Sequence, residues 1–183
     1  MTRLFDILFS IIGLLFLSPI FLIITIIGYF DNGSPIFRQK RVGKGKHAFR
    51  LMKFRSMYID ALSVATHLAS ASSITPFGAF LRKSKLDELP QLWNVFMGDM
   101  SLVGPRPNLF NQNELIDERH SRGVYSVRPG ITGVAQINKI DMSTPQLLAE
   151  TDAKMIQELN TLTYLKYIFL TIFGKGFGDR ISK

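Results

Sequence analysis

An uncharged apolar run from Ile7 to Phe30 constrains this chain more than any other feature. The run is 24 residues long, and about 20 residues of helix are enough to cross the hydrocarbon core of a bilayer. It is too long for a cleavable signal peptide, and no small-residue cleavage motif follows it. The run therefore predicts a membrane helix within residues 1–33, followed by a second domain over residues 34–183.

The centre of this run is interrupted by Ser18-Pro19. Pro19 has no N–H to donate to the carbonyl of Leu15, and its ring clashes there, so the helix must kink or break. Ser18 could supply a partner for the freed carbonyl. Each half covers only about 18 Å at the helical rise, against a hydrocarbon core of about 30 Å. Two alternatives remain open, a kinked span and a re-entrant hairpin.

A strongly basic segment follows the apolar run. By the positive-inside rule, this segment and the domain after it lie in the cytoplasm against anionic head groups. Residues 35–41 and 49–54 alternate apolar with charged side chains on both sides of a Gly43-Lys44-Gly45 turn, which predicts a β-hairpin. A weakly amphipathic helix is expected from about residue 57 to residue 71.

Asp87 and Glu88 form an acidic pair at the start of a short predicted helix. Because Pro90 is tolerated only in the first turn, we expect this helix to begin near Asp87. Its apolar side predicts a buried stripe of Leu89, Leu92, Trp93 and Phe96. The positive end of a helix favours a phosphate, and Arg82 adds a cation just upstream. By spacing alone, the simpler interpretation is a helix cap with a flanking acid.

Two glycine- and proline-containing loops follow the acidic pair. Prolines on both sides of Arg106 restrict the backbone there, and its planar guanidinium matches two phosphate oxygens. The alternative is a structural ion pair with an acid such as Asp99. The second loop, residues 126–136, carries Arg128 and Gln136, which can donate hydrogen bonds, and its glycines allow close backbone approach to a ligand.

The remaining segments predict helices. A polar helix is expected at residues 108–120 and another at about residues 146–159. The apolar stretch at residues 162–173 is too short to span a membrane, so we expect it in the interface or against the core.

Composition narrows the classes of function. The chain has 183 residues and a net charge of +8, which suits a phosphorylated ligand, a polyanion or an anionic membrane surface. There is no cysteine, which excludes disulfides and cysteine metal sites, and the three histidines lack ligand spacing. The basic residues flank the membrane segment without forming an aromatic-interleaved surface, so no nucleic-acid partner is expected.

Several motifs, in this order, resemble the small monotopic bacterial phosphoglycosyl transferases, the sugar-transferase family that starts polysaccharide or glycoprotein glycan assembly. The matching segments are Ser18-Pro19 and residues 53–57 (KFRSM), 81–82 (LR), 86–95 (LDELPQLWNV), 98–107 (GDMSLVGPRP) and 127–133 (VRPGITG). The resemblance covers essentially the whole chain and is weakest at the C-terminal end. It implies a mixed α/β fold, mostly helical, with an N-terminal re-entrant membrane helix, a small cytosolic catalytic domain with one β-hairpin, and interfacial amphipathic helices.

The resemblance also implies a reaction. Asp87 would attack the β-phosphorus of a UDP-sugar, releasing UMP and leaving a covalent aspartyl-phosphosugar, which undecaprenyl phosphate would then take up. Glu88 would assist as a base or metal partner, and Asp87 would be the protein ligand of a required Mg²⁺. The product would initiate assembly of an O-antigen, capsule, exopolysaccharide or glycoprotein glycan.

The remaining roles also come from the resemblance. Arg82 and Arg106 would neutralise the diphosphate, and Arg128 and Gln136 would contact the uridine diphosphate. The enzyme would lie on the cytoplasmic face of the bacterial inner membrane, in contact with its anionic lipids. Its oligomeric state stays open, with a homodimer as one option. The identity of the sugar is not determined by these motifs.

Two rival interpretations are a membrane-tethered basic binding protein and a single-span scaffold subunit. Affinity that falls steeply with salt would support the first, and labelling from the periplasmic side would support the second. Release of UMP from a UDP-sugar would favour the enzyme over both.

Overall fold

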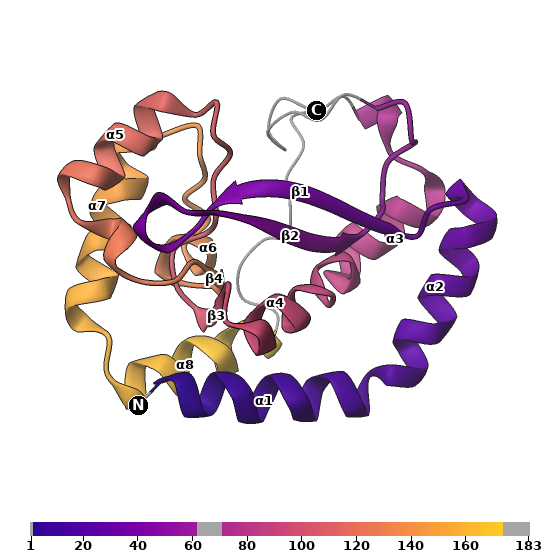
Figure 1. Cartoon of the computed structure of the whole chain (residues 1–183), viewed down its shortest axis with the longest axis horizontal. Coiled ribbons are helices and arrows are strands. Elements are labelled where there is room, and N and C mark those ends of the chain that lie inside the picture. Colours follow the sequence, from indigo (N-terminus) through magenta and orange to yellow (C-terminus); the bar gives the residue numbers. More distant parts are fainter. Residues whose placement is uncertain (1, 62–70, 174–183) are drawn as a thin grey trace.

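The computed structural model describes residues 2–61 and 71–173, and its fold is mixed α/β and mostly helical, as the sequence predicts. A two-stranded hairpin crosses the middle of the molecule in Figure 1. Helix α1 (Thr2–Phe16) runs along the lower edge and α2 (Ser18–Asn32) rises on the right. The helices and loops of the second half of the chain lie on the left and below the hairpin.

The break between α1 and α2 falls at the predicted position. Pro19 occupies the first turn of α2, and the Ser18 hydroxyl donates to the carbonyl of Leu15 at 2.7 Å. The two helix axes differ by 61°. No single helix among the described residues is long and apolar enough to cross a membrane, whereas α1 and α2 together meet the length and hydropathy criteria as a bent pair.

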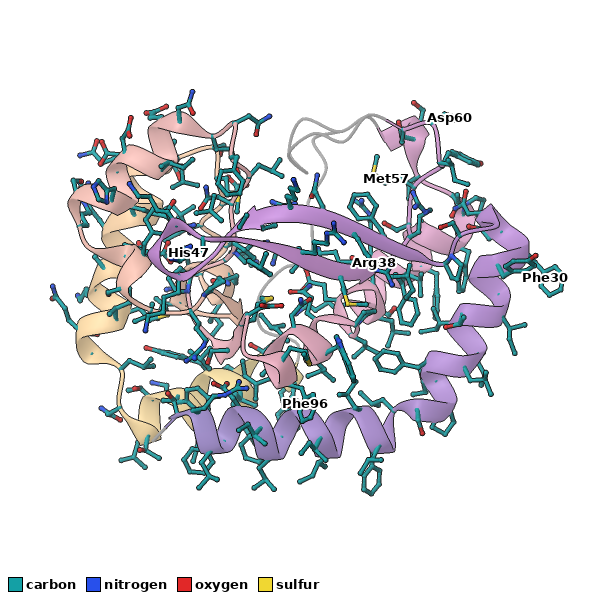
Figure 2. The ribbon with its side chains drawn as sticks, viewed as in Figure 1. Phe30, Arg38, His47, Met57, Asp60 and Phe96 are labelled. Carbon is teal, nitrogen blue, oxygen red and sulfur yellow. The ribbon has the colours of Figure 1, made fainter. Side chains whose placement is uncertain are left out.

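The predicted hairpin is confirmed. Strands β1 (Ile36–Val42) and β2 (Ala48–Phe54) pair antiparallel, joined by a 3-10 turn at Lys44–Lys46. The outer face presents exposed cations, including Arg38 in Figure 2, whereas the inner face buries Leu51 and Lys53. A charged side chain on the inner face of a strand requires a partner, which the acidic pair supplies.

The helix expected from residue 57 is wrong for the residues that the structure describes. Met57 forms an antiparallel bridge with Ile74, and the N–H of Tyr58 donates to the carbonyl of Ser73 at 3.0 Å. This pairing holds the backbone at residues 57 and 58 in an extended conformation, which is incompatible with a helix there. Residues 62–70 of the prediction lie outside the described residues, and a 3-10 turn follows at Ala71–Ser73.

Helix α3 (Pro76–Ser84) begins at Thr75, whose side chain accepts a hydrogen bond from the N–H of Gly78 at 2.8 Å. Gly78 also allows α3 to lie against the backbone after β2, because a Cβ there would sit 2.0 Å from the carbonyl oxygen of Ser56. This close approach brings α3, and the acidic pair after it, under the hairpin.

Helix α4 (Gln91–Met97) contradicts the predicted buried stripe. Trp93 and Phe96 are exposed, at 47% and 36% of their surface, and Leu89 and Leu92 are half-buried. The buried face carries Gln91, Asn94 and Val95 instead. The Asn94 side chain accepts from the N–H of Met52 at 3.0 Å and donates to the carbonyl of Arg50 at 2.8 Å. Asn94 therefore faces inward on α4 because it bonds to the edge of β2.

The two loops expected after the acidic pair contain a short parallel pairing that the sequence did not predict. Strands β3 (Ser101–Val103) and β4 (Gly130–Thr132) lie side by side and are followed by α6 (Val134–Ile137). The contact requires glycine, because a Cβ on Gly130 would sit 2.0 Å from the backbone nitrogen of Gly104.

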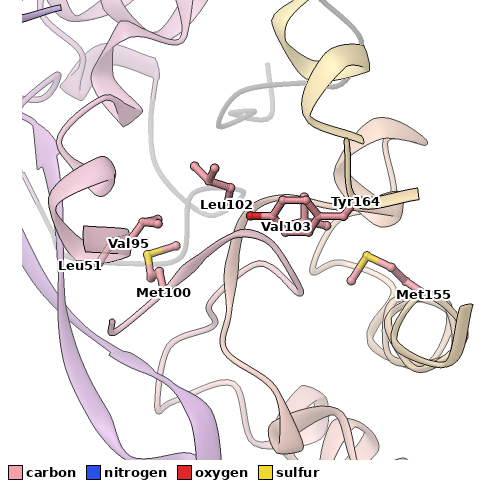
Figure 3. Packing of buried hydrophobic residues seen from close by; sticks show 7 residues of the cluster. All are labelled: Leu51, Val95, Met100, Leu102, Val103, Met155 and Tyr164. Carbon is pink, nitrogen blue, oxygen red and sulfur yellow. The ribbon is translucent and has the colours of Figure 1, made fainter. Parts of the chain in front are cut away.

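Three further helices complete the part of the chain that the structure describes: α5 (Asn113–Ser121), α7 (Pro145–Glu158) and α8 (Thr161–Ile172). The predictions for α7 and α8 are confirmed. The helix predicted from residue 108 begins five residues later, since Leu109 N–H bonds to the Gln112 side chain in a turn. The main core gathers side chains from β2, α4, β3, α7 and α8 (Figure 3), namely Leu51, Val95, Met100, Leu102, Val103, Met155 and Tyr164.

Candidate active site

Asp87 and Glu88 lie on a separate 3-10 turn, Leu86–Glu88, between α3 and α4. The expectation that α4 begins at Asp87 is therefore wrong, since α4 begins at Gln91 after Pro90. Lys85, which joins α3 to the turn, has φ +60°. A non-glycine residue in this left-handed region costs about 1–3 kcal/mol and is typical of functional sites. The strained residue aims the acids away from the axis of α3 and under the hairpin.

Glu88 is held by two cations from distant parts of the chain. Its Oε1 accepts hydrogen bonds from Arg106 Nη2 at 2.6 Å and from Lys53 Nζ at 3.2 Å. Glu88 is 8% exposed, as is Lys53. Charge-assisted bonds of this length are among the strongest in proteins, so Glu88 is fixed in position and its charge is neutralised.

Asp87 is buried, with 1% of its surface exposed. Its Oδ2 lies 4.0 Å from Lys53 Nζ, so the same lysine faces both acids. With Arg106 bound to Glu88, the cluster contains two carboxylates and two cations. A nucleophilic carboxylate in this setting can approach a phosphate without the repulsion of a net negative cluster.

Lys53 is a site residue that the sequence analysis missed, because it was grouped with the basic segment facing the membrane. Its signal is the alternation of β2, in which Leu51 and Lys53 share the inner face. A lysine on the buried face of a strand indicates an acidic partner. The alternation does not identify this acidic partner. The partner is Glu88, which lies 35 residues further along the chain.

The predicted substrate-binding residues divide into two groups. Arg106 meets Glu88, and the alternative pairing with Asp99 is not the one observed. The other three bond elsewhere among the described residues. Arg82 Nε donates to the hydroxyl of Ser56 at 2.7 Å, Arg128 Nε to the carbonyl of Gly98 at 2.7 Å, and Gln136 Nε2 to the carbonyl of Gly104 at 3.4 Å.

Arg128 and Gln136 thus connect the second loop to the first. Arg82 instead bonds to Ser56, which lies just after strand β2. The Nη1 of Arg82 is buried and has no hydrogen-bond partner among the residues that the structure describes. A buried unpaired donor is costly, so this nitrogen is a ready donor for an anionic ligand.

The described residues contain no group of three or more histidine, cysteine or acidic side chains placed to share a metal ion. Mg²⁺ does not require such a group, since it is usually held by one or two carboxylates together with substrate phosphates and water. The oxygen donors of Asp87 and Glu88 suit this hard cation, although Glu88 Oε1 already carries two cationic partners. The acidic pair therefore fits a substrate-assisted magnesium site better than a pre-formed one.

Comparison with known proteins shows the class to which this chain belongs, which is that of sugar-transferring enzymes. The family described as bacterial sugar transferase matches residues 1–176. The chain therefore belongs to the bacterial sugar transferase family.

Named relatives from several bacteria support this assignment. The UDP-glucose:undecaprenyl-phosphate glucose-1-phosphate transferase of Klebsiella pneumoniae is 41% identical over 189 residues, covering 96% of this chain and 40% of that protein. The galactosyl transferase CpsE of Streptococcus agalactiae serotype III is 37% identical over 186 residues, covering 93% of this chain and 41% of that protein. The chain thus spans about two fifths of the length of these two relatives.

A relative of similar length is the exopolysaccharide production protein PSS of Rhizobium leguminosarum bv. phaseoli. It is 36% identical over 197 residues, which cover 96% of this chain and 97% of that protein.

Proposed function

We propose that this protein transfers a sugar 1-phosphate from a UDP-sugar to undecaprenyl phosphate and so initiates assembly of a bacterial glycoconjugate. The observation that carries the proposal is the buried Asp87 beside a Glu88 that Arg106 and Lys53 neutralise, in a chain of the bacterial sugar transferase family. The names of the relatives, which include undecaprenyl-phosphate glucose-1-phosphate transferases, support the substrate class.

In the first step, a carboxylate oxygen of Asp87 attacks the β-phosphorus of the UDP-sugar. A bond forms between this oxygen and the phosphorus, the bond to the bridging oxygen breaks, and UMP leaves with the electron pair. The product is an aspartyl-phosphosugar. Splitting one displacement into two easier ones is the advantage of covalent catalysis. The Lys53 ammonium, 4.0 Å from Asp87, is placed to offset the charge that gathers there as the anionic substrate arrives.

In the second step, a phosphate oxygen of undecaprenyl phosphate attacks the same phosphorus. The aspartyl–phosphorus bond breaks, Asp87 regains its carboxylate, and undecaprenyl-diphosphate-sugar is the product. Glu88 assists the acceptor phosphate, because it lies next to Asp87 and is held in place by Arg106 and Lys53.

Arg82 and Arg106 neutralise the diphosphate in this proposal. Support for the part of Arg82 is its buried Nη1, which lacks a hydrogen-bond partner within residues 2–61 and 71–173. Arg128 and Gln136 act on the uridine diphosphate through the loop that they hold together. Asp87 would be the protein ligand of Mg²⁺, which when bound neutralises phosphate charge as a Lewis acid.

We further propose that α1 and α2 form a re-entrant membrane hairpin, with the site on the cytoplasmic face of the inner membrane. Support comes from both ends of the pair. Asp6 near the start of α1 bonds to β3 and α8, while Ile24 of α2 packs on Phe54 and Leu81. A helix that begins and ends against the same domain does not need to cross a bilayer. The exposed apolar residues of both helices, such as Phe16 of α1 and Phe30 of α2, suit the lipid. Figure 2 shows Phe30 pointing away from the rest of the molecule.

The proposed chemistry is tested by UMP release. With a UDP-sugar and magnesium but no lipid acceptor, the protein should release about one UMP per site and then stop. A sugar-phosphate mass should appear on the peptide that contains Asp87. A panel of UDP-sugars, tested with and without undecaprenyl phosphate, identifies the donor. A preparation that turns over with acceptor but shows neither burst nor adduct would favour direct transfer in a ternary complex.

The re-entrant topology is tested by thiol labelling, since the native chain has no cysteine. A Thr2→Cys variant in intact cells should resist a membrane-impermeant thiol reagent from the periplasmic side and react once the membrane is opened. Adding Ser18→Ala and Pro19→Ala should straighten the helix, since Pro19→Ala restores the backbone donor, and expose the introduced thiol to the periplasm. Periplasmic labelling of the Thr2→Cys chain alone would mean that the helix spans the membrane.

A further inference from the structure

The loop that carries Arg106 is held at every carbonyl from residue 105 to residue 108. The carbonyl of Pro105 accepts from Gly130 N–H at 2.8 Å, and the carbonyl of Arg106 accepts from Arg119 Nη1 at 2.8 Å. The carbonyl of Pro107 accepts from Arg41 Nη1 at 3.3 Å, and that of Asn108 accepts from Val42 N–H at 3.0 Å. These donors come from β4, α5 and β1. An irregular loop in which four successive carbonyls are satisfied by donors from three different elements has little freedom to shift.

Arg119 is almost fully buried, with 1% of its surface exposed. Its Nε and Nη2 bond to Asp152 Oδ2 at 3.0 and 2.6 Å. Its Nη1 is shared between the carbonyl of Arg106 and the side chain of Asn108, at 2.8 and 3.0 Å. The planar guanidinium thus joins α7 to the peptide of Arg106, a reach that a lysine cannot reproduce.

The buried ion pair between Arg119 and Asp152 carries a large desolvation cost. Asp152 has no exposed surface. Burial raises the pKa of its carboxyl, and the charge of Arg119 only partly offsets this rise. A buried ion pair can often be replaced by apolar residues without loss of stability. The contacts that apolar residues could not replace are the hydrogen bonds from Arg119 to the Arg106 carbonyl and to the Asn108 side chain.

We propose that Arg119, held by Asp152, is a positioning residue that sets the guanidinium of Arg106 against Glu88. The bond from Arg119 fixes the Arg106 peptide, and the side chain of Arg106 reaches from there to Glu88 Oε1 at 2.6 Å. A small rotation of that peptide would move the far end of the arginine by much more. Misplacement by about 1 Å at a reacting centre can cost about 100-fold in rate. The catalytic part of the inference rests on the proposed function.

The test replaces the pair with apolar residues, Arg119→Met with Asp152→Leu, so that no buried charge is left alone. We expect UMP release to fall about 10- to 100-fold, with the melting temperature lowered by no more than a few degrees, because the Arg106 carbonyl and the Asn108 side chain lose their bonds to Arg119. Arg106→Met alone should lower UMP release at least as much. Adding the paired replacement to Arg106→Met should lower UMP release by no more than a further factor of about two, because Arg119 acts through Arg106. If the losses multiply instead, Arg119 does not act through Arg106.

A matched control is Arg122→Met with Glu150→Gln. Arg122 also joins α5 to α7, through Glu118 and Glu150, but its bonds do not reach residues 105–108. This control should keep UMP release within about twofold. If the apolar pair variant does not fold, Arg119→Lys replaces it, because lysine keeps the charge next to Asp152 but lacks the guanidinium that reaches the Arg106 carbonyl. The loss of UMP release in Arg119→Lys should likewise nearly disappear when Arg106→Met is already present.

A second readout does not depend on activity. The guanidinium ¹⁵N resonance of Arg106, assigned by its loss in Arg106→Lys, should be shifted and sharp in the unaltered chain and should collapse toward the free position in the apolar pair variant. An unmoved resonance would overturn the positioning role. If the unaltered chain releases no UMP from any UDP-sugar, the proposed function fails, and the resonance alone still decides the position of Arg106.

Discussion

Asp87→Asn is expected to lower UMP release by at least about 1,000-fold, on the scale seen when a nucleophile is removed from an enzyme. The amide has nearly the shape of the carboxylate but is a very poor nucleophile. Lys53, which lies 4.0 Å from Asp87 Oδ2, keeps its bond to Glu88 at 3.2 Å in this variant, so we expect the loss to be chemical and not a change of fold. The measurement is the single-turnover release of UMP from the UDP-sugar that supports turnover.

Two controls sharpen this result. Asp117→Asn makes the same change at an exposed site on α5 and should leave the rate within about twofold. Glu88→Gln keeps the nucleophile but weakens the bonds to Lys53 and Arg106, so it should slow turnover while some adduct on Asp87 still forms. Asp87→Asn with near-native UMP release would refute Asp87 as the nucleophile.

The elements that could be predicted from the sequence are those with a local signal. The hairpin has period-two alternation around a glycine turn, α7 and α8 are periodic, and Ser18-Pro19 breaks the first helix for a reason internal to proline. The acidic pair and Arg106 were found because they lie in contiguous motifs. In each case the residues that decide the structure are close together in the chain.

The misses depend on contacts between distant segments. The apolar side of α4 was expected to be buried, yet Asn94 turns inward because it bonds to the backbone of β2. Strands β3 and β4 are too short for a pattern, and they pair because Gly104 and Gly130 can approach closely. Lys53, Arg119 and Asp152 are ordinary charged residues until the fold gives them partners.

Asp6 is a further residue of this kind, and it joins the first helix to strand β3 and helix α8. It is 2% exposed, and its Oδ1 accepts from Ser101 Oγ at 2.9 Å, Leu102 N–H at 2.8 Å and Tyr164 Oη at 2.6 Å. Burial raises the pKa of the Tyr164 hydroxyl, and its bond to Asp6 adds to the rise, so this hydroxyl keeps its proton and donates at physiological pH. A single acid thus bonds α1 to both β3 and α8.

Arg3, one turn earlier, strengthens the same connection. It donates to the carbonyls of Val95 and Phe96 at the end of α4, at 2.5 and 2.7 Å. A cation at the C-terminal end of a helix is favourable. Because α4 directly follows the acidic pair, the docking of α1 bears on the position of Asp87 as well as on stability.

We therefore expect Asp6→Leu to lower the free energy of unfolding of the detergent-solubilised protein by about 3 kcal/mol or more, because each buried donor left without an acceptor costs about 1–3 kcal/mol. Asp6→Asn keeps an acceptor oxygen and should cost less, and Tyr164→Phe, which removes one donor, should cost about 1 kcal/mol.

Leu4→Ala, at a 71% exposed position on the same helix, should change stability by less than about 0.5 kcal/mol. Denaturant unfolding of the four variants measures this order. If Asp6→Leu unfolds like Leu4→Ala, α1 is not bonded to the domain through Asp6. If it is bonded in this way, UMP release should fall in step with stability, since the same helix holds the end of α4.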